Sequence, residues 1–295
     1  CEIIVLKSYL NKSLEEFFTG NSIIYYNLME NHRQSDYIKA SIKYSTGDVI
    51  AYIDDDDLII PGRLKKIEKL FTEDNFLGYY HNNFITIDNN GNIIKNRNYI
   101  TPVFETAYID NKNKKEWFNK NKFLKKLLYI RPDFNSSSIA IRKKLLENFQ
   151  NDYEFNVRPD TFIMLIALMS DYSLLIDSEP LTYYRISDEN VSTSYNADID
   201  KMRSIYTKAF SEGISALNYY GKITGNKYTK YMELREYNLQ LAYNFWSCSK
   251  KYKFNLNKII FLLKIDLVHE LFYYIAAFMP SRLKIMAMRL FYSAN

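Results

Sequence analysis

The chain has 295 residues, of which 47% are hydrophobic and 25% charged, a balance typical of a folded globular protein. This composition excludes a disordered chain, because a chain that buries little apolar surface cannot offset its conformational entropy. Eight glycines and six prolines exclude collagen-like and linker-rich chains. Two cysteines and three histidines exclude a disulfide framework and leave little material for a zinc site.

The net charge of +5 is unevenly spread along the chain. Residues 200–295 carry 15 Lys and Arg against 6 Asp and Glu, whereas residues 1–199 carry 24 against 28. A basic C-terminal third is typical of a protein that meets an anionic surface, and equally of a solvated helical surface. No nucleic-acid-binding motif accompanies the charge, so we expect no nucleic-acid partner.

Short apolar runs alternate with amphipathic segments over the first 75 residues. They predict strands at residues 2–6, 22–26 and 49–53, and helices at residues 11–18, at residues 35–45 and from Pro61 onward. This alternation predicts a mainly parallel sheet with helices on both faces. The sequence opens on an apolar run without Met, so we expect an N-terminal piece to be missing.

The α/β pattern continues less regularly to about residue 197. Asp88-Asn-Asn-Gly91, between two Tyr- and Asn-rich runs, predicts a hairpin, in which His81 is expected to be half-buried. The other predicted elements are a Lys- and Asn-rich helix or loop at 110–126, a strand at 137–141 followed by a helix, a helix after Pro159, and strands at 172–176 and 181–184.

Beyond residue 197 only helical patterns remain, ending near residue 221 and then covering residues 227–250, 256–278 and 281–292. We therefore expect an α/β domain at residues 1–197 and a helical region at residues 198–295. The longest apolar run, residues 259–279, contains three charged residues and a histidine, so no segment is predicted to span a membrane. We expect a cytoplasmic protein.

Four consecutive acids, Asp54, Asp55, Asp56 and Asp57, follow the predicted strand 49–53 directly. Ligands of parallel α/β sheets bind beyond the carboxyl ends of strands. Adjacent carboxylates repel one another unless a cation or a donor-rich ligand lies among them, and a hard divalent ion with a substrate diphosphate suits such a site. The alternative is a solvated acidic turn that interacts with the dipole of the next helix.

Residues 45–64, which contain this acidic run, resemble the DXD region of family 2 glycosyltransferases, which have the GT-A fold. Lys39-Ala40 resembles the family's helix start facing the nucleotide diphosphate. Weaker similarities lie at Tyr79-Tyr80, Ile87-Asp88 and Gly91, and at Leu181–Arg185 with Asn190 and Ser192. The resemblance covers roughly residues 2–195, and an N-terminally truncated, archaeal-type member is one interpretation.

The resemblance implies an inverting, hexosyltransferase-like enzyme that moves a sugar from a UDP- or GDP-sugar to a hydroxyl of a glycan or lipid-linked acceptor. It implies a donor site formed by Asp54, Asp55, Lys39 and Arg185. It also implies that Asp56, assisted by Asp57, binds Mn²⁺ or Mg²⁺, which would stabilise charge on the departing nucleoside diphosphate.

A general base is implied by the same resemblance. Arg158-Pro159-Asp160 stands where the family has Glu-Asp at the start of a helix, so Asp160 would take the proton of the acceptor hydroxyl. The alternative is a helix N-terminal acid stabilised by the helix dipole.

Three positions depart from the family pattern. Lys7 and Ser8 stand in place of an acid pair, and Ser187 stands in place of a histidine. These departures favour a non-catalytic sugar- or lipid-binding protein on a degenerate GT-A domain, whereas the acidic run favours an enzyme. We expect Lys7 to be solvated at its strand end. A sugar nucleotidyltransferase is a further alternative, but it would need a Gly-rich phosphate loop near the N-terminus.

The C-terminal segment 278–292 mixes Arg282, Lys284 and Arg289 with apolar residues. This composition is typical of a helix that lies on anionic lipid, which would make the protein peripheral at the cytoplasmic face of the membrane. Packing on the catalytic domain or on a second subunit is the alternative.

Overall fold

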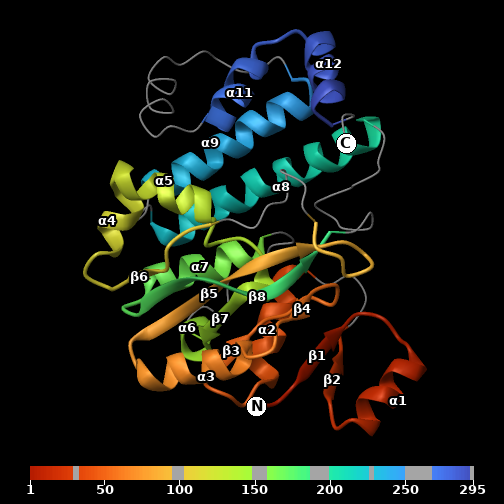
Figure 1. Ribbon diagram of the computed structural model, residues 1–295, viewed down its shortest axis with the longest axis vertical. Coiled ribbons are helices and arrows are strands. Elements are labelled where there is room, and N and C mark those ends of the chain that lie inside the picture. The colour runs from red at the N-terminus through yellow and green to blue at the C-terminus, as the bar shows by residue number, and fades with distance from the viewer. Residues whose placement is uncertain are drawn as a thin grey trace. The chain divides into compact units, whose positions relative to one another are not determined.

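The computed structural model describes residues 1–28, 33–94, 103–147, 158–186, 199–225, 229–249 and 268–292. The chain forms two compact units. The first consists of residues 1–85, 103–111 and 133–184, and the second of residues 86–102, 112–132 and 185–295. Figure 1 shows the sheet in the first unit and long helices in the second.

A small parallel pair opens the first unit. β1 (Ile4–Lys7) and β2 (Ile24–Asn27) are joined by α1 (Lys12–Gly20), which begins after Asn11, whose side chain accepts the Leu14 N–H. Lys7 is only 3% exposed and contacts Glu15 at 2.5 Å and the Tyr9 carbonyl at 2.8 Å. The expectation of a solvated Lys7 is therefore wrong, because Glu15 of α1 supplies a carboxylate beside the strand end.

The main sheet contains β3 (Val49–Ala51), β4 (Leu58–Ile59), β5 (Leu77–Ile87), β6 (Ala107–Ile109), β7 (Ile139–Arg142) and β8 (Ser173–Arg185). Its order is β3-β7-β5-β8-β4, and β6 also pairs with β8. β7 pairs antiparallel with both β3 and β5, and β8 pairs antiparallel with β4 and β6. The prediction of a mainly parallel sheet is therefore wrong here. β3 and β5 run in the same direction but are not neighbours, because β7 lies between them and pairs with both.

Two predicted strands near the end of this unit are one strand. β8 continues through Pro180, and its first half pairs with β6 while its second half pairs with β4. Proline cannot donate a ladder hydrogen bond, so the change of partner falls where such a bond would be missing.

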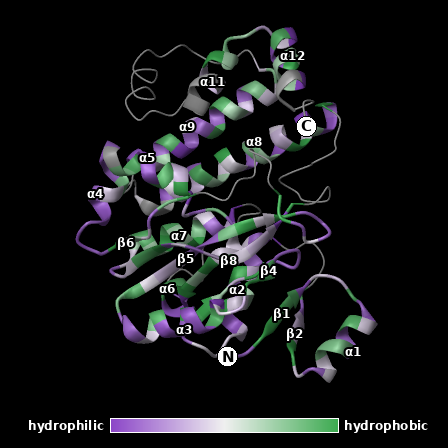
Figure 2. Cartoon of the chain, viewed as in Figure 1, coloured by the Kyte–Doolittle hydropathy of each residue, from purple (hydrophilic) through white to green (hydrophobic). Residues whose placement is uncertain are grey.

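Four helices of the first unit cover the sheet. They are α2 (Gln34–Tyr44), α3 (Arg63–Glu73), α6 (Lys143–Glu147) and α7 (Pro159–Met169). α7 buries every residue from Thr161 to Leu168, as expected of a helix that is apolar all round. On α3, Ile67 and Phe71 pack with Leu77 of β5 in the core. Figure 2 shows apolar residues along the central strands.

The second unit begins with the hairpin after β5. The Asp88 N–H donates to the Asn92 carbonyl at 2.9 Å, so the predicted turn forms. The helices of this unit are α4 (Lys114–Asn119), α5 (Asn121–Ile130), α8 (Ile199–Thr224), α9 (Thr229–Trp246), α11 (Val268–Ala277) and α12 (Ser281–Tyr292). The α/β class with a helical C-terminal region is therefore confirmed, although part of the predicted helix 256–278 lies outside the described residues.

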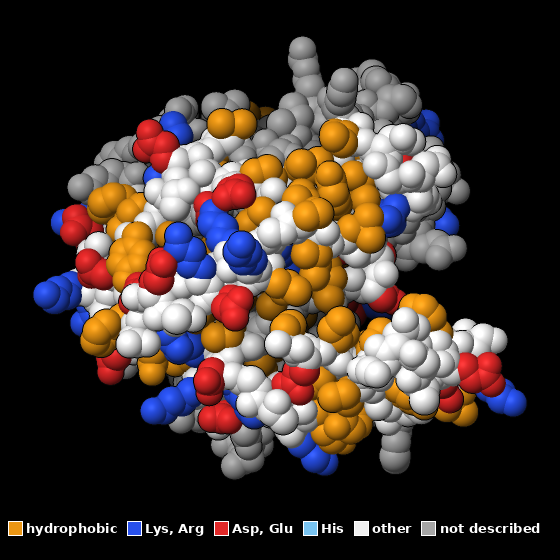
Figure 3. Space-filling model, turned by 60° about the horizontal axis from the view of Figure 1, so that its bottom comes forward, with side chains coloured by type: hydrophobic (Ala, Val, Ile, Leu, Met, Phe, Trp, Pro, Cys, Tyr) orange, Lys and Arg blue, Asp and Glu red, His pale blue; other side chains and the backbone are white. Residues whose placement is uncertain are grey.

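Within the described ranges, no helix combines the length and the apolar character that a membrane crossing requires. On the face drawn in Figure 3, the coloured basic and acidic side chains are interspersed with apolar ones. The described part of this face therefore carries no large field of a single sign.

Candidate active site

The acidic run forms a turn at the end of β3. The Asp57 N–H donates to the Asp54 carbonyl at 3.3 Å, which closes the turn. Asp54, Asp55 and Asp56 are exposed, whereas Asp57 is 6% exposed. The first three acids are thus open to a ligand from solvent, and Asp56 is a stronger candidate for ion contact than Asp57.

A neighbouring loop holds Asp54 by two hydrogen bonds. The Ser136 hydroxyl donates to Asp54 Oδ2 at 2.6 Å, and the Asp54 N–H donates to Ser137 Oγ at 2.9 Å. Surrounding protein atoms shield the Asp54 carboxyl from water and so raise its pKa. The hydrogen bond from Ser136 lowers that pKa, whereas the charges of Asp56 and Asp55 raise it further. The acids at this turn therefore repel one another.

Asp160 lies in the first turn of α7. Pro159 occupies the start of this helix, and the preceding Arg158 has a φ of 58° in the left-handed region. The Asp160 carboxylate accepts the Thr161 N–H at 2.8 Å and the Asn135 N–H at 3.1 Å. The helix N-terminus and these two donors stabilise the carboxylate charge.

Residues 133–138, here called the bridging loop, carry the contacts to both acids. The loop is fixed at its start, where the Thr161 hydroxyl donates to the buried Asp133 at 3.1 Å. It contains Asn135 at a φ of 68°, whose side chain accepts the Ser137 N–H at 2.9 Å. It ends in the 3-10 turn Ser136–Ser138, where a strand was predicted to begin. The loop is therefore well defined on both sides of Asn135.

His81 of β5 contacts the bridging loop at Phe134. Its Nε2 lies 2.6 Å from the Phe134 carbonyl, and its side chain is 2% exposed, so the expectation of a half-buried residue is wrong. Burial lowers the pKa of His81 to about 4. The ring is therefore neutral near pH 7, and because a carbonyl can only accept, the proton resides on Nε2.

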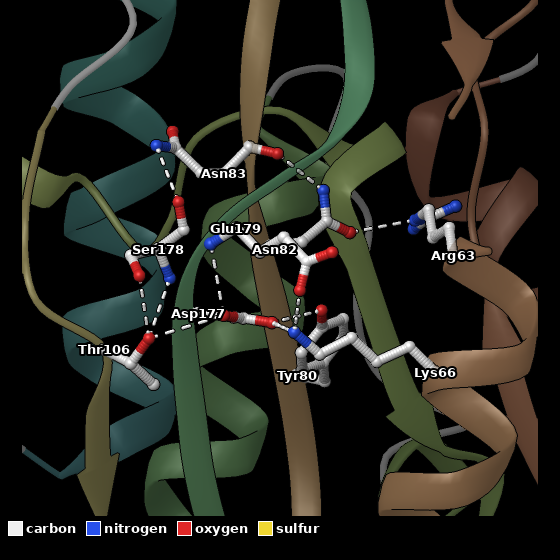
Figure 4. Close-up of polar contacts among 9 residues, drawn as sticks. All are labelled: Arg63, Lys66, Tyr80, Asn82, Asn83, Thr106, Asp177, Ser178 and Glu179. Carbon is white, nitrogen blue, oxygen red and sulfur yellow. Dashed lines mark hydrogen bonds and ion pairs between the residues drawn. The ribbon is translucent and has the colours of Figure 1, made fainter. Parts of the chain in front are cut away.

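A buried arginine fixes the strand ends beneath the acidic turn. Arg63 is fully buried and donates to the carbonyls of Tyr52 and Ile139, each at 3.2 Å. It also donates to Asn82 Oδ1 at 2.9 Å (Figure 4). Tyr52 leads into the acidic run and Ile139 follows the bridging loop. One side chain thus ties together the two segments that position Asp54.

Asn82 extends this network to β8. Its amide donates to the Thr182 hydroxyl at 2.9 Å, and Thr182 donates to the Ser137 carbonyl at 3.2 Å. The sequence reasoning missed Arg63, Asn82 and Thr182. Arg63 lies within the segment that resembles the DXD region, but an arginine in the first turn of a helix is ordinarily solvated, so no signal indicated its burial.

A second polar cluster lies beside Asn82 (Figure 4). Lys66 of α3 contacts Asp177 and Glu179 of β8, each at 2.5 Å, and the Tyr80 hydroxyl donates to Asp177 at 2.8 Å. Burial would raise the pKa of Asp177, but the bonds from Lys66 and Tyr80 outweigh it and lower that pKa. This cluster attaches α3 to β8.

Two further predicted site residues, Lys39 and Arg185, belong to other elements. Lys39 is half-buried on α2. Arg185, in the second unit, donates to the carbonyls of Asp88 and Asn89 at 2.8 and 3.0 Å and so supports the hairpin. Their role in donor binding stays a prediction. Ser187, Asn190 and Ser192 lie outside the described residues.

The donor set at the acidic turn suits a hard divalent ion in chemistry. Among the described residues, no group of three or more His, Cys, Asp and Glu is arranged to hold a metal ion. Mg²⁺ in nucleotide sites is commonly held by one or two carboxylates together with substrate phosphates, so such a group is not required. The exposed, mutually repelling carboxylates fit this second kind of site.

A shallow groove of about 660 Å³ lies in the second unit along α8 and α9. It is lined by Asp200, Arg203, Ser204, Thr207, Lys208, Ser211, Glu212, Tyr243 and Ser247. None of the predicted site residues lines it, so it belongs to the helical unit and not to the site described above.

The model of glycosyl transferase family 2 matches residues 5–149, a segment that contains the acidic turn and the bridging loop. No curated protein matches the chain. Among solved structures, S. aureus TarS 1–349 in complex with UDP-GlcNAc is 12% identical, with 83% of this chain and 70% of that chain covered and a TM-score of 0.48.

Two further solved structures have similar architecture. S. aureus TarS 1–349 alone is 13% identical, with 86% and 84% of the two chains covered and a TM-score of 0.46. A197 from STIV is 13% identical, with 64% and 87% covered and a TM-score of 0.37. Residues 5–149, about half of the chain, are thus similar to glycosyl transferase family 2.

Proposed function

We propose that the protein is a glycosyltransferase that moves a sugar from a UDP- or GDP-sugar to an acceptor hydroxyl with inversion of configuration. The observation that supports this most directly is the bridging loop, which hydrogen-bonds Asp54 through Ser136 and Asp160 through Asn135. A donor-side acid and a candidate base are thereby held by adjacent residues. Such proximity is what a single displacement between two bound substrates requires.

In the proposed reaction, Asp160 accepts the proton of the acceptor hydroxyl as that oxygen attacks the anomeric carbon. The bond from the anomeric carbon to the diphosphate oxygen breaks as the new glycosidic bond forms, and the nucleoside diphosphate leaves with the bonding electron pair. Because attack and departure occur on opposite faces, the configuration inverts. Asp54 and Asp55 contact the nucleotide, and Lys39 also contributes to the donor site. Arg185, in the second unit, stays a predicted donor-binding residue.

Asp56, assisted by Asp57, would hold Mn²⁺ or Mg²⁺ on the donor diphosphate. When bound, such an ion stabilises negative charge on the leaving group. The mutual repulsion at this turn is consistent with cation binding, because a cation among these carboxylates would relieve it.

The test is calorimetric titration of UDP and GDP, each with and without Mn²⁺, on the wild type and on Asp56→Ala. We expect metal-dependent binding in the wild type and its loss in Asp56→Ala. The matched control is Asp171→Ala, which removes an exposed acid before β8 and should bind as the wild type does. Unchanged binding in Asp56→Ala would refute the metal assignment. Binding without sugar transfer would instead favour a non-catalytic sugar-binding protein.

A lipid-linked acceptor and attachment at a membrane surface are the finer parts of the proposal. The exposed face of α12 combines Arg282, Met286 and Arg289 at helical spacing, with Leu283 beside them. Leu283 is 49% and Met286 56% exposed. Apolar side chains flanked by arginines are typical of a helix at an anionic lipid surface.

Flotation with vesicles of phosphatidylcholine and phosphatidylserine tests this surface. We expect the wild type to float and the double variant Leu283→Glu, Met286→Glu to remain in the soluble fraction. Lys201→Gln with Lys222→Gln, which removes two exposed charges from α8, is the control and should float. No flotation of the wild type would exclude lipid attachment.

A further inference from the structure

Two adjacent residues of the bridging loop contact two acids with different proposed roles. The Ser136 hydroxyl lies 2.6 Å from Asp54 Oδ2, and the Asn135 N–H lies 3.1 Å from Asp160 Oδ2. The first contact comes from a side chain and the second from the backbone. A substitution at Ser136 can therefore remove the first contact while leaving the second in place.

The hydroxyl of Ser136 is held by a rigid frame. The Phe134 carbonyl contacts His81, and the Ser137 carbonyl accepts a hydrogen bond from Thr182. Asn135, at a φ of 68°, lies between them, and its side chain accepts the Ser137 N–H at 2.9 Å. These bonds fix the backbone on both sides of Ser136, so its side chain presents a donor at a defined place.

Asp54, by contrast, needs such a donor. Its backbone is fixed by the bond to Ser137, but its side chain is exposed and faces the repulsion of neighbouring carboxylates. Without a partner, the carboxylate would rotate away from those charges. A hydrogen bond from a hydroxyl to a charged carboxylate is short and directional, so it selects one orientation.

We propose that Ser136 is a positioning residue, whose hydroxyl holds the Asp54 carboxylate in the orientation that binds the nucleotide of the donor. It does so from the same turn that holds Asp160, so the donor site and the acceptor base share one support. This inference rests on the proposed function, because it assigns a nucleotide to Asp54.

The experiment compares Ser136→Ala, Ser136→Thr and Ser138→Ala in the full chain. Loss of a hydrogen bond to a charged group predicts that Ser136→Ala binds the nucleotide roughly ten-fold more weakly in calorimetry with Mn²⁺. The donor KM should rise by a similar factor, whereas the acceptor KM should not change. Ser136→Thr keeps the hydroxyl and should restore both values.

Ser138→Ala is the matched control, because it removes a hydroxyl of the same loop that bonds Asn135 and not Asp54. It should bind the nucleotide as the wild type does, and urea unfolding should show that all three variants remain folded. Wild-type binding by Ser136→Ala, or an equal loss in Ser138→Ala, would overturn the assignment of Ser136 alone. A wild type that binds neither UDP nor GDP would overturn the proposed function and this inference together.

Discussion

Asp160 accepts two backbone hydrogen bonds at the start of α7, and these bonds fix the orientation of its carboxylate. A fixed orientation is what a general base needs in order to meet the proton of a bound acceptor. A structural acid in a helix first turn would have the same hydrogen bonds, so the two roles differ only in what a substitution does to catalysis.

Asp160→Asn should therefore lower kcat by a factor of about 10² to 10⁴, the usual contribution of a general base. The amide keeps the size of the side chain and can still accept one backbone N–H, so folding and nucleotide affinity should change little. Steady-state rates and UDP or GDP titration measure the two quantities. A variant that is less stable but fully active would assign Asp160 to the helix cap alone.

His81 gives the protein a pH dependence of stability. Its pKa is lowered to about 4 in the folded state, whereas an unfolded histidine titrates near pH 6.5. The unfolded chain therefore binds a proton first, so this contribution is fully present above pH 6.5 and is lost as the pH falls toward 4. The shift corresponds to about 3 kcal/mol in total, of which about 2 kcal/mol is lost by pH 5.

His81→Gln should flatten this dependence, because an amide can donate to the Phe134 carbonyl and does not titrate. Urea unfolding at pH 7.5 and pH 5.0 measures the difference in unfolding free energy for each protein. We expect the difference to be smaller in His81→Gln by about 2 kcal/mol. An equal difference in both proteins would place the acid sensitivity in other groups.

At the scale of elements, Arg63 joins the end of β3 to the start of β7 through two carbonyls and reaches β5 through Asn82. Burial lowers the pKa of Arg63 to about 10, so the guanidinium remains charged at neutral pH. The three acceptors lie in directions that match its fork of donors.

Arg63→Lys should lower the free energy of unfolding by about 1–3 kcal/mol, because an ammonium on a shorter stem leaves buried acceptors without a donor. Nucleotide binding should weaken as well, since the acidic turn is built on these strand ends. Chemical unfolding and calorimetry measure the two effects. Lys69→Arg on the exposed face of α3 is the control. An Arg63→Lys protein as stable as this control would contradict the stabilising role of Arg63.

Local patterns predicted most elements of this fold. A continuous apolar run located β3, apolar residues at helical spacing located α2, and apolar residues after Pro159 located α7. The Asp-Asn-Asn-Gly sequence located the hairpin. Strand order was beyond local reasoning, because the insertion of β7 between β3 and β5 depends on contacts between segments far apart in sequence. The exposed two-residue strand β4 was missed for the same reason, since only pairing with β8 defines it.

The site was predicted in part. The acidic run and Asp160 stand out as charged residues at element boundaries, and their roles stay predictions. Ser136 lies in a row of serines that has no sequence signal of its own, and its contact with Asp54 joins residues 82 positions apart. Buried polar partners such as Asn82 look like surface residues until the fold brings their partners to them.

At the scale of the molecule, ligand binding should be visible as stability, because a ligand that binds only the folded state shifts the unfolding equilibrium. A nucleotide at a hundred-fold excess over its Kd should add about 2.7 kcal/mol and raise the thermal midpoint. The gain should require Mn²⁺ and vanish with a chelator or in Asp56→Ala. A gain that survives chelation would show that the nucleotide binds without the metal.

The sheet order also governs when the first unit can form during synthesis. β5 lies at the centre of the sheet, yet both of its neighbours, β7 and β8, are encoded after it. While the ribosome makes the intervening residues, β5 and β3 have unpaired backbone groups on the sides that β7 will occupy. Such edges favour association with other chains. Until β7 and then β8 leave the ribosome, β3 and β5 cannot complete their pairing. We therefore expect chaperones to matter most for the growing chain.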